Sequence, residues 1–207
     1  MFETFTLGGL AIPSIYMAIL LSLVVTYLML WDSEEKRTLF SRWVNALIIL
    51  FLIYKITYLF FNWNAFTDNP FGVFYYDGGA QGLLIALMAA FLYLFYQSKG
   101  LFYVEAYCIF AVSFLTFQGI LEFRTLMQWH YIALAIITLA VLVSIYFIWR
   151  RFRVIFILSI TIFLMHLIAR FFIYSGPEFV GISIIQWWII LSLVYSVLTT
   201  VKDAESE

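Results

Sequence analysis

The chain has 207 residues, of which 65% are apolar and only 11% are charged, and its net charge is −1. About a quarter of the residues of a soluble domain are charged, so this composition excludes an ordinary soluble protein. The mean hydropathy of +1.02 requires lipid rather than water as the solvent for most of the surface. The nearly neutral charge gives no basis for nucleic-acid binding.

The N-terminal segment carries Glu3 but no Lys or Arg, whereas a cleaved signal peptide opens with positive charge. We therefore expect the first apolar run to remain as a membrane span. Seven apolar runs each approach the length that crosses about 30 Å of hydrocarbon. They cover residues 11–31, 43–61, 81–97, 101–120, 131–149, 154–173 and 181–201. The sequence predicts an all-α polytopic membrane protein with one transmembrane domain (1–201) and a polar tail (202–207).

Positive charge is unevenly distributed among the segments that join these runs. Eight cations fall on alternate connections and on the tail: Lys36, Arg37, Arg42, Lys99, Arg150, Arg151, Arg153 and Lys202. Arg124 is the one cation on a connection of the opposite side. Because cytoplasmic segments carry the excess of Lys and Arg, we expect the N-terminus outside and the C-terminus in the cytoplasm.

Two further cations, Lys55 and Arg170, lie within the second and sixth predicted spans. A cation at a helix centre costs ~2.5–3.5 kcal/mol on insertion scales, so such residues are candidates for function. Tyr58 shares a helical face with Lys55, and His166 precedes Arg170 by one turn. A cavity lined by these four residues near the outer ends of their spans would attract an anionic headgroup such as a phosphate. Alternatively, the cations snorkel to the interface and His166 is a hydrogen-bonded core residue.

Other chemistry is not indicated by the sequence. Cys108 is the only cysteine, so it cannot form a disulfide within the chain, and we interpret it as a small buried apolar residue. Glu105 lies near the cytoplasmic end of the fourth run, where we expect it to be solvated. The sequence contains no metal-ligand spacing, P-loop, Rossmann glycine pattern or nucleophile elbow, so neither a metal nor a cofactor is expected.

An ordered series of motifs runs through the segment KITYLFFNWNAFTDNPFGVFYYDGGAQG. A cation, a Tyr three residues later, an aromatic run with an Asn, an Asn-Pro pair and an acidic residue before Gly-Gly follow one another. The series consists of Lys55, Tyr58, Asn62, Asn69, Pro70, Asp77, Gly78 and Gly79. Its order resembles that of the prolipoprotein diacylglyceryl transferase family, which has Arg in place of Lys55. The runs LGGLAIPSIYMAILLSLVVTYLMLW and ISIIQWWIILSLVYSV are similar to the family's first and last spans.

The resemblance implies a seven-span enzyme of the bacterial cytoplasmic membrane, which acts on phosphatidylglycerol and a lipoprotein precursor. In the family's reaction a cysteine thiol attacks a glycerol carbon, and glycerol phosphate leaves. On this resemblance we expect catalytic roles for His166, Arg170 and Tyr58. The substrate-binding residues that it implies are Lys55, Asn62, Asp77, Gly78, Gly79, Gln81 and Arg124.

Several family motifs differ in this chain. Gln81 lies nearest to a family His, and the stretch QGILEF (118–123) stands where the family has Gly-Arg-x-Gly-Asn. His166 and Arg170 overlay a family Arg and Glu. Two alternatives therefore stay open. One is a catalytically degenerate member that binds lipid or a partner membrane protein, and the other is a small transporter whose charged path is formed by Lys55, Glu105 and Arg170.

Overall fold

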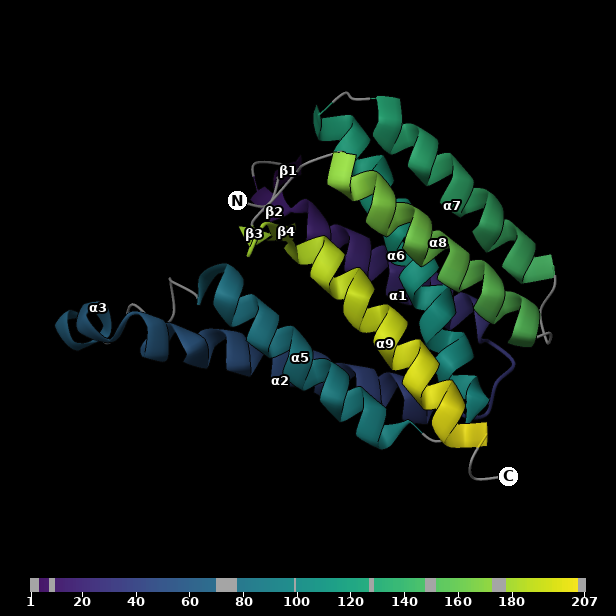
Figure 1. The fold of residues 1–207 in the computed structure, drawn as a ribbon, viewed down its shortest axis with the longest axis horizontal. Coiled ribbons are helices and arrows are strands. Elements are labelled where there is room, and N and C mark those ends of the chain that lie inside the picture. The colour runs from purple at the N-terminus through teal and green to yellow at the C-terminus, as the bar shows by residue number, and fades with distance from the viewer. Residues whose placement is uncertain are drawn as a thin grey trace.

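The computed structural model describes residues 4–7, 10–69, 78–98, 100–126, 129–147, 152–172 and 178–204, most of which are helical (Figure 1). The helices are α1 (Ser14–Met29), α2 (Lys36–Phe61), α3 (Trp63–Asp68), α5 (Gly79–Gln97), α6 (Leu101–Leu126), α7 (Trp129–Phe147), α8 (Phe152–Phe172) and α9 (Ile184–Ala204). Two short antiparallel hairpins pair β1 (Thr4–Leu7) with β2 (Leu10–Pro13) and β3 (Glu178–Phe179) with β4 (Ile182–Ser183).

Six helices of the described chain, namely α2, α5, α6, α7, α8 and α9, are long and apolar enough to cross a membrane. This confirms the prediction of an all-α polytopic membrane protein. The seventh predicted span corresponds to α1, which has only 16 residues. It is shorter than predicted because the start of that apolar run forms β2, which ends at Pro13, and a proline holds the residue before it in an extended conformation.

Three helices extend beyond their predicted spans by at least three residues. α2 begins at Lys36 rather than at residue 43, and α9 continues to Ala204, into the predicted polar tail. α6 continues to Leu126, so that residues 121–126, predicted to be part of a connection, are helical. Polar side chains are tolerated in these end turns because they lie close to the membrane surface. The extension of α6 places a carboxylate, Glu122, inside the bundle.

α6 is the central and most enclosed of the spanning helices, with α1, α7, α8 and α9 packed around it (Figure 1). Small side chains such as Ala106, Cys108 and Ala111 are fully buried along it, which lets neighbouring helices approach closely. Cys108 is thus a buried residue, as predicted. The Tyr107 hydroxyl lies 2.6 Å from Ser192 Oγ of α9, a polar link between two helices.

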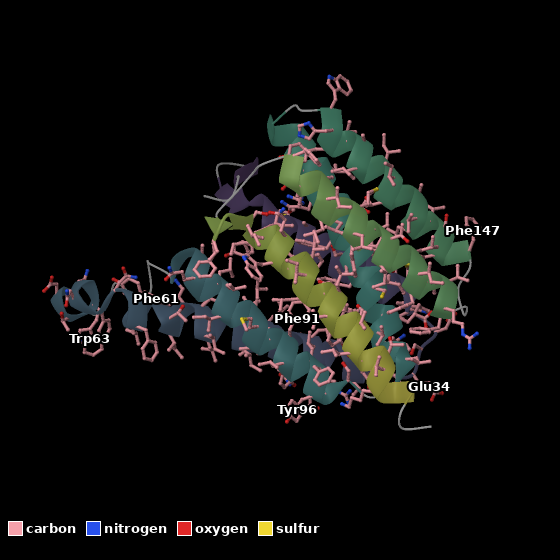
Figure 2. All side chains as sticks on the ribbon, viewed as in Figure 1. Glu34, Phe61, Trp63, Phe91, Tyr96 and Phe147 are labelled. Carbon is pink, nitrogen blue, oxygen red and sulfur yellow. The ribbon has the colours of Figure 1, made fainter. Side chains whose placement is uncertain are left out.

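The α2–α5 pair diverges from the rest of the bundle at one end, and α3 extends beyond it (Figure 1). Figure 2 shows Phe61 and Trp63 at the tip of this arm, and both side chains are exposed. At the other end, Phe91 of α5 packs against Tyr195 of α9 with ring centroids 6.0 Å apart. The arm is therefore joined to the bundle by α5, which packs on α9 and also contacts β3, and by the N-terminal part of α2, whose Trp43 packs on Phe110 of α6.

The start of α9 is fixed by reciprocal capping. Ser183 N donates to Gln186 Oε1 at 2.8 Å, and Gln186 N donates to Ser183 Oγ at 3.3 Å. The turn between β3 and β4 has positive φ at Val180 (55°) and Gly181 (71°), as a tight hairpin of this kind requires. Trp187 Nε1 donates to Phe179 O at 3.2 Å, which ties the hairpin to α9.

Candidate functional site

A buried polar cluster lies between the C-terminal ends of α6 and α8. α6 contributes Gln118 and Glu122, which are four residues apart and therefore share one helical face. α8 contributes His166 and Arg170 with the same spacing. Their exposed fractions are 3%, 4%, 1% and 5%, respectively. We call these four residues the α6–α8 cluster.

Charge-assisted hydrogen bonds hold the cluster together. Arg170 Nη2 donates to Glu122 Oε2 at 3.0 Å, which forms an ion pair. Gln118 Nε2 donates to the other carboxylate oxygen, Glu122 Oε1, also at 3.0 Å. His166 lies one turn before Arg170 on the same face of α8. Glu122 therefore orients both Gln118 and the guanidinium, and it offsets the charge that made Arg170 costly in a membrane.

Several polar atoms of the cluster have no hydrogen-bond partner among the described residues. These atoms are Arg170 Nε, Gln118 Oε1 and both ring nitrogens of His166. Buried polar groups are normally hydrogen-bonded, and a membrane interior supplies no bulk water to replace a missing partner. A set of donors and acceptors of this kind is suited to a bound polar ligand.

The structure brings together only two of the residues that the sequence predicted to form the site. His166 and Arg170 share the cluster, whereas Lys55 and Tyr58 belong to the far part of α2, in the arm that diverges from α8 (Figure 1). Tyr58 is buried within the arm, and Lys55 is half-buried. Of the four residues predicted to line one cavity, two therefore belong to the cluster and two belong to the arm.

The other predicted substrate-binding residues also lie near the arm or outside the described residues. Asn62 caps the C-terminus of α2, and Gln81 is exposed in the first turn of α5. Asp77 and the side chain of Arg124 lie outside the described residues, although the Arg124 backbone belongs to α6. The predicted binding residues that the structure describes thus gather around the junction of α2 and α5 rather than around Arg170.

A packing role accounts for one of the predicted glycines. A Cβ atom at Gly78 would lie 2.1 Å from Thr57 Oγ1, and one at Gly82 would lie 2.2 Å from the same oxygen. The two glycines are four residues apart, the spacing at which small residues let helices approach closely in membranes. Gly79 adopts a φ of 64°, a conformation that favours glycine at the start of α5.

Sequence reasoning missed Glu122 and Gln118. The fourth span was predicted to end at residue 120, which placed Glu122 in a connection and left Arg170 without an intramembrane counter-charge. The signal was the spacing itself: Gln118 and Glu122 repeat every four residues, as His166 and Arg170 do. A cation within an apolar run predicts an acidic partner at the same membrane depth, and Glu122 satisfies that rule.

The charged path suggested for a transporter is not continuous in this structure. Glu105 and Glu122 both belong to α6, and 17 residues of helix separate them by roughly 25 Å. Glu105 is half-buried rather than fully solvated, and its Oε1 has no partner among the described residues. Lys55 lies in the arm, so the three charges belong to three separate parts of the molecule.

The chain matches no protein-family model, no curated protein and no solved structure. Among the described residues, no group of His, Cys, Asp and Glu side chains is arranged to hold a metal ion. The α6–α8 cluster combines a cation, a carboxylate and an imidazole, which can bind an anion and exchange a proton.

Proposed function

We propose that the α6–α8 cluster binds the headgroup of a phospholipid through its phosphate. The observation that carries the proposal is the buried guanidinium of Arg170, whose Nε atom has no partner among the described residues, next to a buried imidazole in the same condition. Arg170 Nε–H and one N–H of His166 are suited to donate to phosphate oxygens.

The depth of the cluster in the bundle supports a headgroup as the ligand. Glu122 lies four residues before the end of α6, and Arg170 lies two residues before the end of α8. At 1.5 Å per residue, these positions are within about 6 Å of the helix ends. A phospholipid phosphate lies near this level in a bilayer, so it would reach the cluster without crossing the hydrocarbon.

We further propose seven spans, with α1 as the first, in a bacterial cytoplasmic membrane. The α1–α2 and α5–α6 connections, the N-terminus of α8 and the C-terminus of α9 lie at one end of the bundle (Figure 1). The cation-rich segments of the sequence belong to this end, which the positive-inside rule assigns to the cytoplasm. The α6–α8 cluster then faces the outer leaflet, and the N-terminus is outside.

A second candidate is the transfer reaction that the sequence resemblance implies. A precursor's thiol sulfur would attack a glycerol carbon of phosphatidylglycerol, form a C–S bond and break the C–O bond to phosphate, so that glycerol phosphate leaves. Arg170 would stabilise the departing phosphate, and His166 would accept the thiol proton. A buried cation and a buried imidazole one turn apart on α8 favour this candidate.

A binding role without turnover is favoured by a different observation. Glu122 already pairs with Arg170, which weakens the positive field available to a leaving phosphate. The other residues that the resemblance assigns to catalysis and binding on α2 and in the first turn of α5 belong to the arm. Under this interpretation the site holds a lipid or serves a partner membrane protein.

Lipid retention in purified protein tests the binding proposal. We expect Arg170→Met to lower the amount of phospholipid that co-purifies in mild detergent by about tenfold, because the phosphate loses a charge-assisted contact. Arg153→Met is the matched control, since Arg153 belongs to the same helix and is exposed near its other end. Equal retention by Arg170→Met and wild type would refute the proposal.

The transfer candidate needs its own assay. Purified protein is incubated with phosphatidylglycerol and a cysteine peptide of the lipoprotein type, and thioether product is measured by mass spectrometry. Product that disappears in His166→Gln would support transfer. A lack of product from wild type, while an authentic diacylglyceryl transferase works in parallel, would leave the binding role as the function.

A further inference from the structure

We infer that the α6–α8 cluster selects a headgroup that carries an ammonium group as well as a phosphate, such as phosphatidylethanolamine. The inference rests on the proposed headgroup binding and adds its specificity. It also departs from the phosphatidylglycerol expected from the sequence resemblance. Glu122, which the resemblance did not include, is the residue that determines this specificity.

The charge balance of the cluster is the first argument. Arg170 and Glu122 form a 3.0 Å ion pair, so their formal charges cancel. A headgroup with one net negative charge would add an uncompensated charge to a buried site. A zwitterionic headgroup adds no net charge, and each of its charges meets an opposite one in the cluster.

The hydrogen-bonding inventory is the second argument. The atoms without a partner among the described residues include an obligate donor, Arg170 Nε, and an obligate acceptor, Gln118 Oε1. Phosphate oxygens only accept, so they match the guanidinium but leave the amide oxygen unmatched. A primary ammonium has three N–H donors, which match Gln118 Oε1 and the adjacent carboxylate of Glu122.

The arrangement of these groups gives the headgroup a direction. Gln118 and Glu122 belong to α6, whereas His166 and Arg170 belong to α8. The acceptors for an ammonium thus lie on one helix, and the donors for a phosphate lie on the other. Glu122 contacts both Arg170 and Gln118 at 3.0 Å, which joins the two halves of the site.

A competition experiment with three lipids tests the inference. Purified protein is equilibrated in nanodiscs that contain equal amounts of phosphatidylethanolamine, phosphatidylcholine and phosphatidylglycerol with matched acyl chains, and the retained lipid is identified by native mass spectrometry. We expect phosphatidylethanolamine to exceed phosphatidylglycerol by about tenfold. Phosphatidylcholine should be intermediate, because its quaternary ammonium keeps the charge but has no N–H donor.

Glu122→Gln tests the assigned residue. The amide keeps the size of the side chain and can still accept from Arg170 while removing the negative charge, so we expect the preference to shift toward phosphatidylglycerol. Glu35→Gln, at an exposed position before α2, should leave the preference unchanged. If Glu122→Gln fails to fold, the ranking of the three lipids by wild type still decides the matter.

The outcomes separate this inference from the function on which it rests. Retention of phosphatidylglycerol above phosphatidylethanolamine, or equal retention of both, would overturn the inference while headgroup binding stands. Failure of wild type to retain any of the three lipids would overturn the proposed function itself. A preference that Glu122→Gln leaves unaltered would remove Glu122 as its determinant.

Discussion

Two regions of this protein contain charged or polar residues within apolar sequence, and they differ in how those residues are used. In the α6–α8 cluster, Arg170 has a buried carboxylate partner and is itself buried near the end of α8. In the arm, Lys55 lies on a helix whose outer surface is largely apolar and exposed, and its neighbour Thr57 packs against two glycines. An ion pair connects the helices of the first region, and close packing of glycines against a threonine connects the helices of the second.

This difference teaches that a cation in an apolar run has to be judged by its counter-charge. Arg170 meets Glu122 from another helix, and the pair leaves further polar atoms available for a ligand. Lys55 lies near the C-terminal end of α2, where a lysine can extend its amine toward the membrane surface. The two cations looked equivalent in the sequence because the position of a residue in an apolar run indicates its depth in the membrane but not which side chains of other helices contact it.

The largest expected effect comes from removing one half of the buried ion pair. Glu122→Leu should lower the free energy of unfolding by about 3–5 kcal/mol, because it leaves the Arg170 guanidinium buried without a counter-charge. Reversible unfolding in detergent, followed by circular dichroism, measures the loss.

The matched control is the double variant Glu122→Leu/Arg170→Leu. It should recover most of the lost stability, since replacing both members of a buried pair by apolar residues is often neutral. A single variant as stable as wild type would show that the pair does not organise this region.

A smaller loss is expected in the arm from Gly82→Ala. The added Cβ would lie 2.2 Å from Thr57 Oγ1, so α2 and α5 must separate or Thr57 must rotate. Overpacking of this kind costs about 1–3 kcal/mol, measured by the same unfolding assay.

The partner variant isolates the cause of that loss. Thr57→Ala removes the clashing oxygen, so Thr57→Ala/Gly82→Ala should be more stable than Gly82→Ala alone. If the two substitutions were simply additive, the close approach of Gly82 to Thr57 would not be what holds α2 against α5.

Most of the fold could be predicted from the sequence because hydrophobic length is a local property. Runs such as 131–149 and 154–173 correspond to α7 and α8 within a few residues. The predicted boundaries are wrong mainly at helix ends, because the helices continue through polar residues that the sequence analysis assigned to connections. The extension of α6 to Leu126 is the one with functional consequences, since it includes Glu122.

The site was only partly predictable. The spacing of His166 and Arg170 indicated that they act together, and both belong to the cluster. The prediction that Lys55 joins them could not be checked against the sequence, because the distance between two helices depends on tertiary packing that a single sequence does not encode locally, and the structure places Lys55 in the arm. Gly78, assigned to substrate by resemblance, lies against Thr57, where a larger side chain would clash.

A hydrogen bond outside both regions shows how much stability an ordinary polar contact between two helices contributes. The Tyr107 hydroxyl lies 2.6 Å from Ser192 Oγ and joins α6 to α9. Tyr107→Phe should cost only about 0.6 kcal/mol, the average for hydrogen bonds between membrane helices. The unfolding assay measures it, with Tyr96→Phe, an exposed tyrosine at the end of α5, as the control (Figure 2). If Tyr107→Phe lowered the free energy of unfolding as much as Glu122→Leu, the ion pair would contribute no more than an ordinary hydrogen bond.

The smallest expected effect is that of Lys55→Met on lipid retention. Because Lys55 lies in the arm and not in the α6–α8 cluster, its neutralisation should leave the retained phospholipid unchanged, while Arg170→Met lowers it. Co-purified phospholipid in the two variants, measured as phosphorus per mole of protein, provides the comparison. If Lys55→Met lowered retention as much as Arg170→Met, the arm would have to approach the cluster in the membrane. The two regions would then form a single headgroup site, as the sequence alone predicted.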